Sequence, residues 1–159
     1  MSGRNMRVSE RASSIETLVR LHRRIAVDSN VLIYLLEGSG PRAELAALLL
    51  DAIARGEVEG VLASVGLAEV LVPAAKADNG PVFEQTAATI RDLGLHIVAL
   101  DAQVAENAGW IRGRTGASMS DAMHLACALR AGATTFVTND RRMPSSTRLE
   151  IVVLDDLVA

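Results

Sequence analysis

Four acidic residues of this chain interrupt apolar segments, where a lone carboxylate is costly. They are Asp28, Glu69, Asp121 and Asp140. Asp28 and Glu69 lie inside apolar runs, Asp121 opens one, and Asp140 closes another. Most of the other acidic residues lie among polar neighbours and need no explanation beyond solvation. Because a chain rarely keeps a buried carboxylate without a partner, these four positions are the first candidates for chemistry.

Four carboxylates that meet at one place repel one another. Each close pair costs roughly 1 kcal/mol in water and about 4 kcal/mol at an effective dielectric constant of 20. Few basic residues lie near them in the sequence, and the chain has a single lysine, Lys76. Mg²⁺ or Mn²⁺, which prefer oxygen ligands, are natural counter-charges. The pattern therefore favours a metal site in which the four acids are both ligands and catalytic residues.

The elements that position these acids follow from the alternation of short apolar runs with helical patterns. Strands are expected at residues 24–27, 58–63, 95–100, 135–138 and 151–154. Helices are expected at residues 31–37, 42–54, 67–76, 81–92, 102–112 and 120–130. This alternation predicts an α/β fold, with a parallel sheet covered by helices on both faces.

In that fold the four acids converge. Asp28 and Asp140 are expected at the carboxyl ends of strands, and Glu69 and Asp121 in the first turns of helices. Open α/β sheets bind ligands at the edge where such positions meet. Each acid also has a simpler explanation, since Asp28 and Asp121 fit helix caps, Asp140 a turn and Glu69 the polar edge of a helix. That all four fall at one edge favours the site.

Composition indicates one globular domain. The chain has 159 residues, of which 50% are hydrophobic and 3% aromatic, so the expected core is aliphatic. Its one cysteine, Cys127, has no partner for an internal disulfide, which fits a reducing cytoplasm. The polar, basic N-terminus contains no secretory signal, and no apolar run is long enough to cross a membrane. A cytoplasmic protein is expected.

Charge is unevenly distributed along the chain. Residues 1–24 hold six arginines against two glutamates, a balance of +4, whereas residues 25–159 hold ten basic and 17 acidic residues, a balance of −7. The basic N-terminal extension is interpreted as a disordered or late-folding tail, and residues 25–159 as one domain. Because the body is acidic, broad electrostatic binding of nucleic acid is not expected, and a nuclease of this charge needs bound metal ions and local arginines.

Four segments resemble those that carry the acids of PIN domains, specifically the VapC toxins of type II toxin–antitoxin pairs. They are residues 27–32, 64–70, 120–126 and 136–140, in the family's order and at suitable separations. The resemblance extends from Ile25 to Leu154. It implies a three-layer α/β/α PIN-like domain with a central parallel sheet, and a Mg²⁺- or Mn²⁺-dependent endoribonuclease. It also implies an RNA substrate, a cognate antitoxin and a homodimer.

The resemblance extends to residues around the acids. Thr138 resembles the hydroxyl residue two positions before the family's last acid, and Ser29 and Asn30 fall where supporting hydrogen-bond donors are expected. Many members continue after the last acid with an acidic and an aromatic residue, but here Arg141 and Arg142 follow, so no fifth acidic ligand is indicated. Four arginines in segments that adjoin the acids are candidates to bind RNA phosphates: Arg112, Arg114, Arg141 and Arg142.

Other interpretations stay open at this stage. A phosphatase of another α/β family could use Asp28 as a nucleophile, although such enzymes normally place a second aspartate two residues on, where this chain has Asn30. A non-catalytic PIN-like interaction module and an RNA-processing nuclease without an antitoxin are further alternatives. His124 is interpreted as a packed histidine rather than a ligand, and Trp110 and Tyr34 as core or interface residues rather than platforms for bases.

Overall fold

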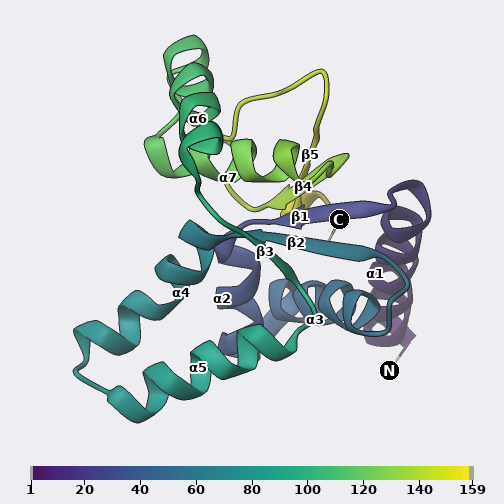
Figure 1. Cartoon of the computed structure of the whole chain (residues 1–159). Helices are drawn as coiled ribbons and strands as arrows, with labels where there is room; N and C mark the ends of the chain where they lie inside the picture. Colours follow the sequence, from purple (N-terminus) through teal and green to yellow (C-terminus); the bar gives the residue numbers. More distant parts are fainter. Residues whose placement is uncertain (1, 158–159) are drawn as a thin grey trace.

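The computed structural model describes the backbone of residues 2–157 and the side chains of residues 7–157; residues 1 and 158–159 lie outside it. A five-stranded sheet lies at the centre, with helices on both faces (Figure 1). The strands are β1 (Arg24–Val27), β2 (Glu59–Ala63), β3 (His96–Val98), β4 (Thr135–Thr138) and β5 (Glu150–Val153). The helices are α1 (Ser2–Leu21), α2 (Ser29–Glu37), α3 (Gly40–Ala54), α4 (Ser64–Lys76), α5 (Gly80–Asp92), α6 (Ala102–Thr115), α7 (Met119–Arg130) and the 3₁₀ helix η1 (Leu154–Leu157).

The strand order β3-β2-β1-β4-β5 makes β1 the central strand, and all four pairings are parallel. From β1 the chain moves toward β2 and β3, and it later returns on the other side as β4 and β5. The junction of β1 and β4 is thus the point where the strand order reverses, and open α/β sheets bind ligands at such a point. The expected three-layer fold with a parallel sheet is confirmed.

Alternate residues of β1 face two separate apolar cores. Ile25 and Val27 pack with the leucines of α2 and α3, whereas Ala26 faces Phe136 and the apolar residues of α6 and α7. This is the period of two that a strand covered on both faces must have. Among residues 2–157 no helix is long and apolar enough to span a membrane.

Several boundaries differ from the sequence-based expectation. Helix α4 begins at Ser64, directly after β2, so Glu69 lies in its second turn and not in the first. Strand β3 is limited to three residues, because the left-handed Gly94 turns the chain just before it. Helix α6 continues to Thr115, where Gly116 at φ 73° ends it. These ends depend on local turns that an apolar pattern does not specify.

The interpretation of the basic extension as a disordered tail is wrong. Its residues form α1, which packs against α3, with Ile15 and Leu18 buried in the same core as the sheet. Arg11 is also buried and forms an ion pair with Glu44 of α3. The hydrophobic signal of this helix is weak because few of its residues are apolar.

Leu18→Ala tests whether α1 belongs to the folded unit. We expect the free energy of unfolding to fall by about 2–5 kcal/mol, since the substitution leaves a cavity in a packed core. Leu21→Ala is the matched control, because Leu21 is 72% exposed and its loss costs at most about 0.5 kcal/mol. Urea unfolding followed by circular dichroism measures both. Equal effects of the two substitutions would contradict the packing of α1.

Candidate active site

The candidate site lies at the carboxyl edge of the sheet, where β1 and β4 end side by side. Glu69, Asp121 and Asp140 line one open hollow of about 370 Å³ together with the turn 116–118. Asp28 lies at the end of β1, where its backbone N–H donates to the carbonyl of Val137 at 2.9 Å. The structure therefore brings together residues from four distant segments of the sequence.

Asp28 is held by protein donors on two sides. It caps α2, and one carboxylate oxygen accepts the Ser29 backbone N–H at 2.8 Å. The other oxygen accepts the Thr138 hydroxyl at 2.7 Å, with Asn30 Nδ2 at 3.3 Å. The Thr138 hydroxyl in turn accepts the Asp140 backbone N–H at 3.0 Å. The three expected supporting donors thus all contact Asp28, and Thr138 links it to Asp140.

Asp121 differs from Glu69 and Asp140 in that its pKa is raised and not lowered. Burial is the largest cause that raises its pKa above the ordinary value, and repulsion from Asp28 and Asp140 raises it further. It is not the cap of α7, because Ser118 fills that role and accepts the Asp121 backbone N–H at 3.1 Å. Asp121 therefore lies within electrostatic reach of both Asp28 and Asp140.

His124 is the functional candidate that sequence analysis placed elsewhere. Its ring packs edge-on against Phe136, with ring centroids 5.9 Å apart, as a packed histidine would. However, Nε2 lies 2.7 Å from a Glu69 carboxylate oxygen and 3.5 Å from one of Asp28. This contact is the largest cause that lowers the pKa of Glu69. Because an ionised carboxylate can only accept a hydrogen bond, Nε2 of His124 is the donor in this contact. His124 therefore bridges two of the acids.

The sequence indicates only part of the position of His124. His124 follows Asp121 by three residues, a spacing that puts both on one helical face. What makes room for its ring is Gly66 of α4, where a Cβ would lie 2.8 Å from the Cε1 atom of His124. That close approach joins two helices far apart in the sequence, so no local pattern predicts it.

The four arginine candidates all have partners within the protein. Arg142 donates to both carboxylate oxygens of Asp140, and this contact is the largest cause that lowers the pKa of Asp140. Arg141 pairs with Asp156 at 2.6 Å, and Arg112 donates to the carbonyl of Ala117 at 2.7 Å. Arg114 stacks on Trp110 (guanidinium carbon 5.8 Å from the ring centroid) and pairs with no carboxylate of residues 7–157.

The acids suit a hard divalent cation by charge and donor type. Besides the carboxylates, the buried Oδ1 of Asn30 has no hydrogen-bond partner and offers a further oxygen. The side chains of residues 7–157 nevertheless include no group of three His, Cys, Asp or Glu already placed around one ion. The carboxylates of Asp28, Glu69 and Asp140 accept hydrogen bonds from other side chains instead. Ligation therefore requires Arg142 to leave Asp140, whereas His124 contacts Oε1 of Glu69 and can stay in place while Oε2 binds the ion.

The chain belongs to the PIN domain family, whose model matches residues 25–148. PIN domains are generally nucleases that depend on divalent metal ions. The fold is similar to that of a chain in a toxin–antitoxin complex from Klebsiella pneumoniae (18% identity, TM-score 0.60), with 82% of this chain and 97% of that chain covered. It is also similar to a chain of VapBC2 from Rickettsia felis bound to a DNA fragment from its promoter (19%, 0.62, with 82% and 98% covered). No curated protein matches the chain significantly.

Asp121→Asn tests the shared electrostatic environment without any metal. The wild-type fold holds a charged Asp121 at a cost that the unfolded chain does not bear, so at pH 7 in EDTA the variant melts at the higher temperature. As the pH falls through the raised pKa toward 3.8, wild-type Asp121 gains a proton and the difference shrinks. Differential scanning calorimetry across this range measures it.

The control for this experiment is Glu106→Gln, an amidation of an exposed glutamate on α6. Its melting temperature stays close to that of the wild type at every pH. If Asp121→Asn melted below the wild type at pH 7, the proposed repulsion among the acids would be wrong.

Proposed function

We propose that this protein is a metal-dependent endoribonuclease, in which Asp28, Glu69, Asp121 and Asp140 hold Mg²⁺ or Mn²⁺. The observation that carries the proposal is that three of the carboxylates line one hollow and that Thr138 links the fourth, Asp28, to Asp140. Among residues 7–157, Arg142 is the one arginine that pairs with any of them. Membership of the PIN family supports it, since PIN domains are generally nucleases. The same membership argues against a phosphatase that uses Asp28 as a nucleophile.

Different residues of the chain orient the acids and contact the substrate. Thr138 and the α2 N-terminus orient Asp28, and His124 orients Glu69. A bound divalent ion supplies Lewis-acid stabilisation of the negative charge that develops on the scissile phosphate. Arg142, once released from Asp140, is free to contact a phosphate of the substrate. The acids thereby receive their counter-charge from the ion, and the arginine passes to the RNA.

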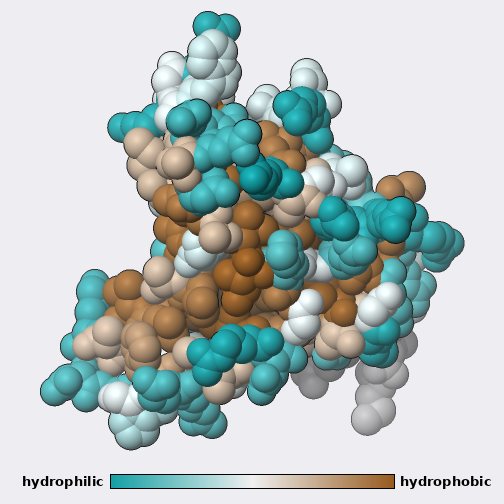
Figure 2. Space-filling model, viewed as in Figure 1, coloured by the Kyte–Doolittle hydropathy of each residue, from teal (hydrophilic) through white to brown (hydrophobic). Residues whose placement is uncertain are grey.

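We further propose that the nuclease is the toxin of a toxin–antitoxin pair, acts in the cytoplasm, and forms a homodimer. The two similar structures are toxin–antitoxin assemblies, which supports an antitoxin partner. Figure 2 shows apolar side chains gathered over α4 and α5, and Val72 and Val82 there are exposed at 45% and 44%. Apolar surface of this kind is available for a partner or for a second copy. A neighbouring small gene with a DNA-binding pattern would favour the toxin role over RNA processing.

Cleavage of RNA is the direct test. The purified protein, freed of any partner, is incubated with a mixed RNA pool in Mg²⁺, Mn²⁺ or EDTA. We expect cleavage in either metal, none in EDTA, and a loss of at least about 100-fold in Asp121→Asn, because even supporting residues of metal sites change activity by about 10–100-fold. Asp92→Asn, at the exposed end of α5, is the matched control and retains activity. A folded wild type that binds metal yet leaves RNA intact would favour the non-catalytic module.

His124 gives a second test, based on metal binding rather than activity. His124→Ala removes the donor that orients Glu69, so the Mn²⁺ affinity falls by roughly 10–100-fold in isothermal titration calorimetry. His124→Gln retains a side-chain N–H and recovers part of that affinity. Cys127→Ala, one turn further along the same buried face of α7, controls for repacking and binds Mn²⁺ like the wild type. An unchanged affinity in His124→Ala would remove His124 from the site.

A further inference from the structure

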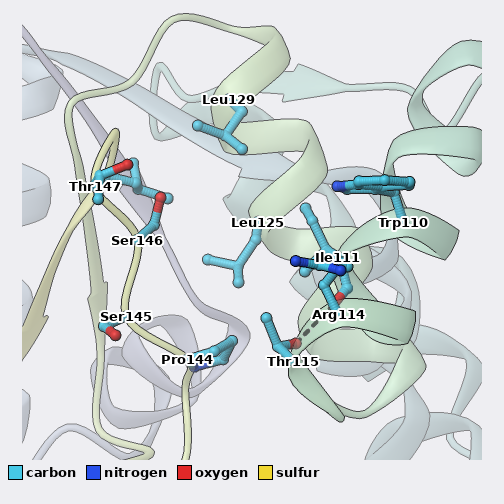
Figure 3. A pocket seen from close by; sticks show the side chains of 11 residues that line it. Trp110, Ile111, Arg114, Thr115, Leu125, Leu129, Pro144, Ser145, Ser146 and Thr147 are labelled. Atoms are coloured by element: carbon cyan, nitrogen blue, oxygen red, sulfur yellow. Dashed lines mark hydrogen bonds between the residues drawn. The ribbon is translucent and has the colours of Figure 1, made fainter.

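A second hollow lies beside the candidate active site, between α6, α7 and the segment 144–149, and measures about 520 Å³. Figure 3 shows Trp110, Arg114 and Thr115 on one side of it and residues 145–147 on the other. Leu125 and Leu129 lie between the two sides. Its volume lies in the range of sites that hold a small organic group such as a nucleotide.

Trp110 is 69% exposed at this hollow and is the only tryptophan of the chain. Of the two expectations for Trp110, a core or an interface residue, this exposure excludes the core and leaves the interface untested. An indole buries a large apolar area when it is covered, so leaving it in water forgoes stabilisation that a ligand could recover. A planar partner that stacks on the ring is the natural occupant, and every nucleobase has such a face.

The charge around the hollow fits a polyanion. Of the residues that line it, all within the described part of the chain, none is acidic and Arg114 is the one that carries a charge. Ser145, Ser146 and Thr147 add hydroxyl groups at the opposite side. In a chain with a net charge of −3, such an acid-free surface with an arginine that pairs with no carboxylate is where a phosphate meets least repulsion.

Arg42 provides a comparison for Arg114 within the same molecule. Another hollow, of about 400 Å³, also presents an aromatic ring beneath an arginine, since Arg42 lies 5.4 Å from the ring centroid of Tyr34. There Arg42 donates two hydrogen bonds to Asp155, and Glu37 also lines the wall. That arginine is already neutralised, whereas Arg114 is free to bind an external phosphate.

The two segments that border this hollow also border the acids. Thr115 immediately precedes the turn 116–118 of the acidic hollow, and Pro144 lies two residues after Arg142 of that hollow. An endonuclease cuts inside a chain, so its substrate continues across the surface on both sides of the scissile phosphate. The path over Thr115 and Pro144 leads directly to Trp110.

We propose that this hollow binds a nucleotide of single-stranded RNA that flanks the cleavage position, with the base stacked on Trp110 and a phosphate paired with Arg114. The proposal rests on the proposed ribonuclease function and adds a substrate-binding subsite to it. Stacking tolerates every base, so the subsite favours unpaired RNA over duplex RNA, in which bases already stack on one another.

Trp110 itself reports on its occupancy. The full-length Asp121→Asn protein in EDTA is titrated with a short single-stranded oligoadenylate, and the tryptophan emission is recorded. We expect saturable quenching by the single strand and much weaker quenching by a duplex of the same length. Binding of labelled oligoadenylate without quenching would overturn the proposal. A blue shift that grows with protein concentration in the absence of RNA would also overturn it, because it would mark Trp110 as a protein–protein contact.

Variants test the contribution to binding and separate it from catalysis. Trp110→Ala weakens binding of single-stranded RNA by roughly 5- to 150-fold, as expected for one stacked base, while Trp110→Phe keeps most of the affinity. Arg114→Ala weakens binding and its salt dependence, whereas Arg42→Ala, at the neutralised hollow, leaves both unchanged. Cleavage is measured with metal in a protein that keeps Asp121. In that assay Trp110→Ala raises KM for long RNA and leaves kcat near the wild-type value.

The outcomes distinguish the subsite from the nuclease. If oligoadenylate quenches Trp110 and the RNA pool stays intact, the subsite holds and the ribonuclease function fails. If RNA is cleaved but Trp110→Ala changes neither affinity nor KM, the nuclease holds and the subsite is wrong. Trp110, Arg114 and Arg42 all lie on the exposed surface, so the fold survives in each variant.

Discussion

The parallel pairing of β1 with β4 is the constraint on which the site depends. Their register places Val27 beside Val137, so the residues that follow each strand leave the sheet together. Asp28 then bonds to the Val137 carbonyl and the Thr138 hydroxyl, and Thr138 holds the backbone of Asp140. A slip of one residue in this pairing would turn Asp28 away from Thr138, because side chains alternate between the faces of a sheet.

The acids can lie close together because the fold stabilises their charged forms to different extents. His124 lowers the pKa of Glu69 and Arg142 lowers that of Asp140, whereas burial raises that of Asp121. Glu69 and Asp140 thus have side-chain donors that lower their pKa, whereas for Asp121 burial of the carboxylate outweighs the hydrogen bond from Ser118. Environments that push similar groups apart in pKa are typical of sites with assigned roles.

The sequence allowed the α/β class and the positions of Asp28 and Asp140 after strands to be predicted, because an acid after an apolar run is a local signal. The bridge from His124 to Glu69 was not predictable, since it needs the missing side chain of Gly66 on another helix. The packing of α1 was missed for a similar reason: Ile15 and Leu18 are buried against distant parts of the chain, and Arg11 pairs with Glu44, 33 residues away. Contacts between distant segments leave no periodic trace in either one.

The acidic hollow and the hollow lined by Trp110 have different electrostatic roles in the proposed nuclease. The acids repel a phosphate until a cation neutralises them, so they cannot supply the initial attraction for RNA. That attraction has to come from surfaces nearby that lack carboxylates, and Trp110 with Arg114 forms such a surface. Stacking is independent of net charge, which makes an exposed indole more useful on a chain of −3 than one further arginine would be. In the proposed ribonuclease, RNA is thus bound beside the acids and cut at them.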